Sequence, residues 1–199
     1  MHDAGVPDGV YQNLFINYEQ SDYLLADDRL SGVTITGSTE VGRSVASKAS
    51  HALKKNVMEL GGSDAMVVMP DADMGKAISG AIMGRLTNSG QVCLADKRMF
   101  IHESLYDTFL NGVTSAANKL IAGDPINKET TYGPLSSKRA AAKVKSQIAK
   151  AVENGATATV IGPDVSSDGA WVPVTILTNV TPDNPIAQEE IFGPIVLQL

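Results

Sequence analysis

The sequence predicts an α/β protein built around a mostly parallel sheet with flanking helices. Residues 33–36 form a predicted strand, a glycine-bearing turn follows at 37–42, and an apolar period of four then marks a helix. A second predicted strand at 56–59 comes directly after it. Strands that alternate with helices in this way form parallel sheets. An apolar fraction of 43% and a charged fraction of 19% are typical of a globular chain.

The N-terminal residues have no clean helical period. Residues 4–9 are rich in turn formers. The sequence predicts a short strand at 10–16 and a short helix at 18–27. The helix that follows the strand at 33–36 is indicated by Val41, Val45, Ala49 and Leu53, with lysines near its end, where cations suit the helix dipole.

The middle of the chain repeats the alternation. A predicted strand at 65–69 precedes a helix with an apolar face that ends near Asn88, and a strand at 98–101 comes after a polar loop. The helical face is formed by Met74, Ala77, Ile78, Ala81, Ile82 and Leu86. We expect Ser104 to cap the next helix, whose apolar positions are Leu105, Phe109, Leu110, Val113 and Leu120.

The last third contains the clearest helix, at about 136–154. Val144, Ile148 and Val152 are predicted to face inward, and Gly155 stands where a C-terminal cap is expected. Further strands are predicted near 159–161, at 171–176 and at 195–199. The final apolar residues look like a strand cut off within a sheet, and residues 1–5 look like the tail of a helix. We therefore expect the chain to be an internal piece of a longer protein.

Composition restricts the classes of function. The chain has 16 basic and 22 acidic residues, a net charge of −6, and no basic tract, so we expect no nucleic-acid partner. No apolar run reaches membrane-spanning length, and we expect a cytoplasmic protein without a membrane partner. The single cysteine excludes an internal disulfide. The three histidines have no ligand spacing, so we expect no metal site.

Cys93 is the first candidate chemical group. It lies in the polar loop Asn88-Ser89-Gly90-Gln91-Val92-Cys93, between a predicted helix and a predicted strand. Lone cysteines are often inert buried hydrophobes, but such a loop favours an exposed nucleophile, which acts as its thiolate. Lys97 and Arg98 could favour that thiolate or could simply be solvated. We expect Cys93 to be alkylated faster than an ordinary thiol at neutral pH.

Glu59 is the second candidate, as a general base. It closes a predicted strand and is followed by Leu60-Gly61-Gly62. A carboxylate at this place can simply mark where a strand meets water, whereas the two glycines permit an unusual backbone or a close approach. Together, Glu59 and Cys93 suggest covalent catalysis with a separate proton acceptor.

The turn from Gly37 to Gly42 is a candidate phosphate site. Its spacing is GxxxxG, neither the dinucleotide fingerprint nor a P-loop. Ser38 stands where a strand turns into a helix, so it could cap the helix or help its free amides to bind phosphate. Near the C-terminus, Glu190 and Phe192 lie in a Gly-Pro loop that could hold a ribose and a ring.

These motifs together resemble those of the aldehyde dehydrogenase superfamily, in its order and over nearly the whole chain. The motifs are Val33-Thr34-Ile35-Thr36-Gly37-Ser38-Thr39-Glu40-Val41-Gly42-Arg43, Glu59-Leu60-Gly61-Gly62, Asn88-Ser89-Gly90-Gln91-Val92-Cys93 and Glu189-Glu190-Ile191-Phe192-Gly193-Pro194. The resemblance implies an α/β catalytic domain at 62–199, truncated at its C-terminal end, preceded at 1–61 by the last part of a Rossmann-like NAD(P)-binding domain.

The resemblance also implies a reaction, the NAD(P)-dependent oxidation of a small aldehyde. Cys93 would form the thiohemiacetal and thioester, and Glu59 would activate the hydrolytic water. The cofactor, NAD or NADP, would contact Gly37, Ser38 and Gly42 through its phosphates, Leu60 and Phe192 through the nicotinamide and Glu190 through the ribose. The family's chains are longer, and their oxyanion-hole Asn, cofactor Lys and oligomerisation strand are absent here. We therefore expect no turnover by this chain alone and a homo-oligomeric parent enzyme.

The substrate is left open between succinate semialdehyde and a small aliphatic aldehyde. Members of the family that grip a carboxylate commonly place Arg where this chain has Thr87, and Arg85 is expected on another face of the helix. Leu94 stands in place of the second cysteine of some redox-regulated members. Two alternatives are acyl transfer to coenzyme A, which Glu59 argues against, and a non-catalytic fragment that self-associates through a sheet edge.

Overall fold

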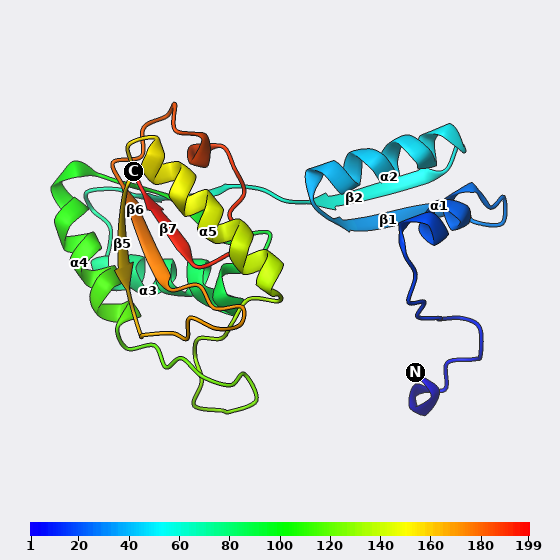
Figure 1. The fold of residues 1–199 in the computed structure, drawn as a ribbon, viewed down its shortest axis with the longest axis horizontal. Coiled ribbons are helices and arrows are strands. Elements are labelled where there is room, and N and C mark those ends of the chain that lie inside the picture. The colour runs from blue at the N-terminus through cyan, green and yellow to red at the C-terminus, as the bar shows by residue number, and fades with distance from the viewer. The chain divides into compact units, whose positions relative to one another are not determined.

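The computed structural model describes residues 1–199 and divides them into two compact units, Met1–Leu60 and Gly61–Leu199 (Figure 1). Each unit contains helices packed on parallel strands, which confirms the predicted α/β class.

The first unit is a strand–helix–strand unit. Strand β1 (Gly32–Gly37) pairs in parallel with β2 (Lys55–Leu60), and helix α2 (Thr39–His51) makes the crossover. Helix α1 (Tyr18–Ala26) precedes them and starts with a capping box between Asn17 and Gln20. The predicted helices and strands of 18–59 are therefore all present.

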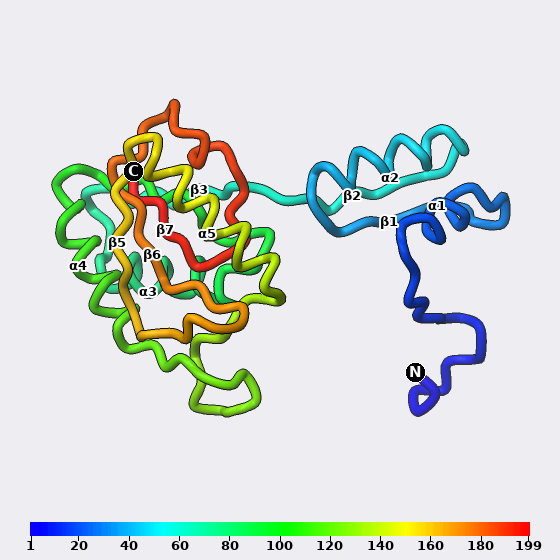
Figure 2. The backbone as a smooth tube through the Cα atoms, viewed as in Figure 1, coloured from blue at the N-terminus to red at the C-terminus, as the bar shows by residue number.

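The predicted strand at 10–16 is wrong. Apart from the short 3₁₀ helix η1 (His2–Ala4), the backbone up to Asn17 forms no helix or strand (Figure 2). A strand is stable only when its backbone groups pair with a neighbour, and β1 and β2 pair only with each other. The apolar side chains of this segment accordingly stay exposed, Phe15 at 96%.

The second unit is organised around a five-stranded sheet with the order β3-β4-β7-β6-β5. Its strands are β3 (Asp64–Val68), β4 (Asp96–Ile101), β5 (Thr157–Ile161), β6 (Val174–Thr178) and β7 (Ile195–Gln198). All neighbours run in parallel except β5, which is antiparallel to β6. The mostly parallel sheet predicted from the alternation is confirmed.

Helices cover both faces of this sheet. Helices α3 (Met74–Leu86) and α4 (Tyr106–Ala117) lie on one face and α5 (Lys138–Glu153) on the other (Figure 1). Successive residues of β7 point to opposite faces: Val196 belongs to the core under α3 and α4, whereas Leu197 belongs to the core under α5.

Several predicted element ends are wrong. Ser104 does not cap α4, because it lies inside a 3₁₀ turn, η3 (Glu103–Leu105). The backbone N–H of Ser104 donates a hydrogen bond to Nδ1 of His102 at 3.3 Å. The α4 helix ends at Ala117, before Leu120, and β6 begins only at Val174. The expected inward position of Val152 is also wrong, because 45% of its surface is exposed.

Candidate active site

The loop that carries Cys93 has a strained backbone. It begins with the 3₁₀ turn η2 (Thr87–Gly90) after α3 and leads into β4. Asn88, Ser89 and Gly90 have φ angles of 51°, 54° and 76°, three left-handed residues in succession. Residues other than glycine adopt this conformation rarely, at a cost of about 1–3 kcal/mol each, and they keep it only where the surrounding structure imposes it. Such a loop requires contacts that fix it.

Side-chain hydrogen bonds tie the loop to a second segment of the chain. The Ser89 hydroxyl donates to the carbonyl of Gly133 at 2.7 Å. The Gln91 side-chain oxygen accepts from the backbone N–H of Ser136 at 2.8 Å. Gln91 and Asn88 also exchange bonds with each other's carbonyls at 3.1 and 3.2 Å. Sequence reasoning missed Ser89 and Gln91, although small polar residues around a glycine are typical of left-handed turns.

Cys93 is exposed and has a free thiol, so it is not the inert core residue that a lone cysteine often is. Lys97 holds the turn from inside: its fully buried ammonium donates to the carbonyls of Cys93 at 2.9 Å and Ala95 at 3.3 Å. Burial lowers the pKa of Lys97, with a further lowering from Arg85. Lys97 is thus a fixed support of the turn and not a solvated cation.

Arg98, the second nearby cation, lies elsewhere. Its Nε donates to the carbonyl of Ser63 at 2.9 Å, and its guanidinium stands 5.8 Å from the centre of the Phe100 ring. Both contacts hold it at the β3–β4 pair.

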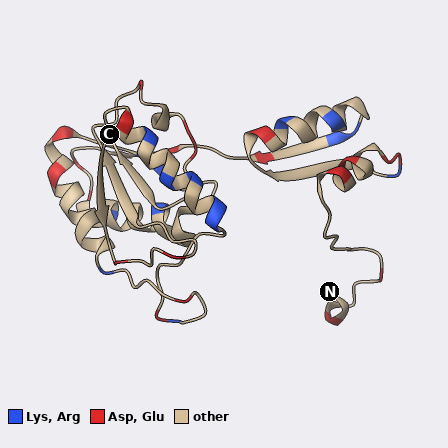
Figure 3. Ribbon diagram, in the orientation of Figure 1, with Lys and Arg blue, Asp and Glu red and all other residues tan.

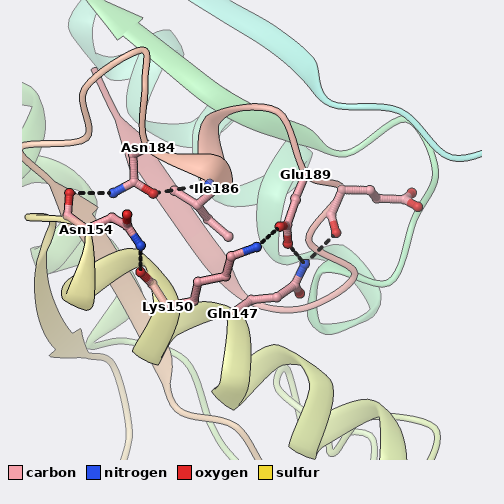
Figure 4. A network of polar contacts seen from close by, with 7 residues as sticks. Gln147, Lys150, Asn154, Asn184, Ile186 and Glu189 are labelled. Atoms are coloured by element: carbon pink, nitrogen blue, oxygen red, sulfur yellow. Dashed lines mark hydrogen bonds and ion pairs between the residues drawn. The ribbon is translucent and has the colours of Figure 1, made fainter.

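The loop that carries Glu190 and Phe192 is fixed by α5. Gln147 donates to a carboxylate oxygen of Glu189 at 3.2 Å and to the carbonyl of Glu190 at 3.0 Å, and Lys150 forms an ion pair with Glu189 at 2.6 Å (Figure 4). Hydrogen bonds from Lys150 and Gln147 lower the pKa of Glu189. Before this loop, the 3₁₀ turn η4 (Pro185–Ala187) is capped by Asn184, which also bonds the end of α5.

Glu190 has an unused acceptor. Its Oε1 atom is buried and has no hydrogen-bond partner. The backbone of Gly61 lies so close that a Cβ there would overlap the Glu190 carboxylate, so the first glycine of the Gly-Gly pair permits a close approach. Phe192, two residues further on, is 42% exposed. A half-buried carboxylate and an exposed ring two residues apart suit a ligand with a hydroxyl and a planar group.

Arg85 is a site component that the sequence did not reveal. It is fully buried in the last turn of α3 and donates to the carbonyls of Ile191 at 2.8 Å, Ile195 at 2.5 Å and Gly193. Burial lowers its pKa to about 10, although Asp96 and Glu190 act in the opposite direction. With no exposed surface, this guanidinium does not contact a ligand that arrives from the solvent.

The other predicted site residues belong to the first unit. The Ser38 hydroxyl accepts from the N–H of Val41 at 3.3 Å and so caps α2. Gly37 ends β1, and Gly42 allows α2 to approach β2: a Cβ there would lie 2.5 Å from a methyl group of Leu60. Glu59 and Leu60 are the last two residues of β2, and Glu59 is exposed.

The charge distribution gives no sign of a further ligand site. Figure 3 shows Lys and Arg spaced along α5 and acidic residues scattered over the other elements. No three His, Cys, Asp or Glu side chains gather closely enough to hold a metal ion. No helix has both the length and the apolar character needed to cross a bilayer.

Comparison with known proteins gives a consistent result. The model of the aldehyde dehydrogenase family matches residues 1–198. A succinate-semialdehyde dehydrogenase [NADP(+)] of Deinococcus radiodurans is 41% identical over 196 residues, which are 98% of this chain and 41% of the relative. The chain therefore spans less than half the length of such relatives.

Solved structures agree with this match. The structure of Gox0499, studied for cofactor and substrate selection, superposes with a TM-score of 0.94 at 47% identity, over 99% of this chain and 43% of that one. Succinic semialdehyde dehydrogenase from Streptococcus pyogenes, in complex with NADP+, superposes with a TM-score of 0.94 at 40% identity. The match covers 99% of this chain and 43% of that one.

Proposed function

Because this chain belongs to the aldehyde dehydrogenase family, we propose that it supplies the nucleophile and part of the cofactor site for NAD(P)-dependent oxidation of an aldehyde to a carboxylic acid. The observation that carries the proposal is the exposed Cys93 in a loop held by Lys97, Ser89 and Gln91. A nucleophile acts best when its approach is fixed before the substrate arrives.

In the proposed reaction, the Cys93 thiolate attacks the aldehyde carbon and forms a thiohemiacetal. A nicotinamide cofactor, when bound, would accept the hydride that this carbon loses as it becomes the thioester carbon. Cys93 then holds the acyl group as a thioester. Glu59 takes a proton from water, the resulting hydroxide attacks the thioester carbon, and the acid leaves as Cys93 regains its thiolate.

Each unit by itself has residues that suit a part of a nicotinamide dinucleotide. The half-buried Glu190 carboxylate can accept from a ribose hydroxyl, and the exposed Phe192 ring can pack beside a planar ring. Ser38 and Gly37 stand at the N-terminus of α2, where free amides and the helix dipole favour phosphate. Gly42 and Leu60 support this end of the helix. We assign residues 1–61 to the cofactor domain and 62–199 to the catalytic domain.

We propose a small aldehyde as the substrate. The relatives described above are succinate-semialdehyde dehydrogenases, and their names or complexes include NADP. Succinate semialdehyde with NADP is therefore one candidate pair of substrate and cofactor. However, Thr87 replaces the carboxylate-binding Arg expected from family resemblance, and Arg85 is buried. A small aliphatic aldehyde is therefore an equal choice. We propose a homo-oligomer for the parent enzyme, as in the family.

The first test separates acyl chemistry from the rest of the reaction. An aryl ester donates its acyl group to a thiolate and needs no cofactor. We expect mass spectrometry to find one acyl group on Cys93, added faster than in the urea-unfolded chain and absent in Cys93→Ala. Acylation no faster than in the unfolded chain would contradict the proposal.

The second test concerns the base. In Glu59→Gln, we expect the acyl group to be hydrolysed about 10²–10⁴-fold more slowly. Thioester transfer that requires coenzyme A would instead favour an acyl-transferring enzyme. NAD(P)H formation should be assayed beside it with short aldehydes and succinic semialdehyde. From this chain alone we expect none, and self-association without acylation would favour the non-catalytic alternative.

A further inference from the structure

We propose that Arg85 is a positioning residue that fixes the loop of Phe192 and Glu190 against the loop of Cys93. This inference rests on the proposed function, because it assigns these loops to the cofactor and the nucleophile. Arg85 would act only through the main chain, since its side chain has no exposed surface.

The first argument is the set of hydrogen bonds that Arg85 makes. Nη2 donates to the carbonyls of Ile191 and Gly193, and Nε donates to the carbonyl of Ile195. These carbonyls flank Phe192 on both sides. Three bonds from one rigid planar group define both the position and the orientation of the segment.

The second argument is that α3 connects directly to the nucleophile loop. Arg85 lies two residues before Thr87, where η2 begins. A Cβ on Gly90 would overlap the carbonyl of Gly193 and would lie 3.1 Å from the carbonyl of Arg85. The two loops therefore touch through backbone alone at Gly90 and Gly193, and the Arg85 bonds hold them in that contact.

The third argument is that no other residue type could make these contacts. The ammonium of Lys97 serves Cys93 and Ala95, two carbonyls within one turn, whereas Arg85 spans carbonyls at 191, 193 and 195. A lysine has a single point charge and cannot reproduce a planar fork. An apolar residue would take one donor away from each of these three carbonyls, and the carbonyl of Gly193 would keep only the N–H of Ile195.

The function of such a clamp follows from the reaction geometry. Groups that react must meet close to their productive separation, and a misplacement of about 1 Å can lower a rate about 10²-fold. Cys93 and Phe192 belong to separate loops far apart in sequence. Arg85 is the buried side chain that joins those loops.

The test reports loop position and does not depend on catalysis. Cys93, the only cysteine, is labelled with bimane, whose fluorescence is quenched when a tryptophan lies close to it. The tryptophan is introduced as Phe192→Trp in a chain that also carries Trp171→Phe. We expect strong quenching with Arg85 in place and a loss of quenching in Arg85→Met and in Arg85→Lys.

A matched control distinguishes positioning from general loosening. Tyr132→Phe removes another buried donor to a carbonyl, that of Val172, in the same unit. We expect quenching to be kept in this variant. If Arg85→Met fails to fold by circular dichroism, Arg85→Lys, which keeps the charge, decides the question.

Equal quenching with and without Arg85 would overturn the inference. A loss of quenching in Tyr132→Phe as large as that in the Arg85 variants would overturn it as well. Neither result depends on acylation of unlabelled Cys93 by the aryl ester. Loss of quenching only in the Arg85 variants, with no ester reactivity of Cys93, would retain the clamp and reject the proposed function.

Discussion

The two units of this chain differ in how much core supports them. In the first, the buried residues are few: Leu25, Gly42 and Ala49 in the helices, and Lys54 in the connection before β2. Its sheet has two strands, which alone are marginally stable. The second unit packs helices on both faces of five strands and has two apolar cores.

The difference concerns how a run of left-handed residues is held. The first unit has one left-handed residue other than glycine, the exposed Leu53 just after α2. The left-handed residues Asn88 and Ser89 lie in the second unit, where Gly133, Ser136 and buried cations offer partners. In the first unit, Ser38 makes only a local cap, three residues away. The well-packed unit can therefore fix the loop of the proposed nucleophile in advance, whereas the first unit presents exposed helix and strand ends.

The largest expected effect comes from removing a large buried side chain from the core of the second unit that lies under α3 and α4. Phe109 is fully buried, so Phe109→Ala should destabilise this unit by about 3–5 kcal/mol. Leu25→Ala should leave the second unit unchanged. Urea unfolding followed by the fluorescence of Trp171, which lies in the second unit, measures both. Equal shifts of the midpoint would mean that the two units unfold together.

A smaller effect is expected at the α2–β2 contact of the first unit. Gly42→Ala would place a methyl group against Leu60 and should cost about 1–3 kcal/mol. Gly37→Ala is the matched control, since the nearest atoms to its Cβ are 3.9 Å away, on Val41. Hydrogen exchange of α2 measures both variants. Faster exchange in the Gly37→Ala variant than in the Gly42→Ala variant would contradict this account of the packing.

The smallest effect concerns the ion pair on α5. Because the pKa of Glu189 is lowered in the folded chain, its bond to Lys150 stabilises the second unit above the ordinary carboxyl pKa of 4.5. That contribution is lost as the pH falls through the lowered value. The pair is partly exposed, so Lys150→Gln should cost only about 0.2–1 kcal/mol at neutral pH.

The control for the ion pair is Lys145→Gln, which removes an exposed charge of the same helix that has no ion pair. Thermal unfolding at neutral and acidic pH would compare the two variants. A difference between them that grows as the pH falls would contradict the assigned sign.

The sequence predicts most elements because their apolar periods are long and their glycine turns are distinct, as in the helix around Val144. It fails at residues 10–16, where the composition favours a strand but the segment pairs with neither β1 nor β2. It also fails at Ser104. His102 caps the 3₁₀ turn η3, and the spacing of apolar residues does not indicate which of the two polar residues is the cap.

The sequence suggests candidate site residues but not the contacts that hold them. Cys93, Glu190 and Phe192 stay predictions, made because their residue types have recognisable functions in a glycine-bearing loop. Arg85 lies on the same buried face of α3 as Ala77 and Ala81, and the three residues are spaced four apart. That spacing indicates burial, but only the fold brings the carbonyls of residues 191–195 to it.

The most direct test of the central claim is the rate at which iodoacetamide alkylates Cys93 at neutral pH, followed by intact mass. The rate in the native chain is compared with that in the same chain unfolded in urea, where the thiol is ordinary. The account predicts faster alkylation in the native chain, because the thiol is exposed in a turn that Lys97, Ser89 and Gln91 fix in place. An equal or slower rate in the native chain would contradict a preformed nucleophile.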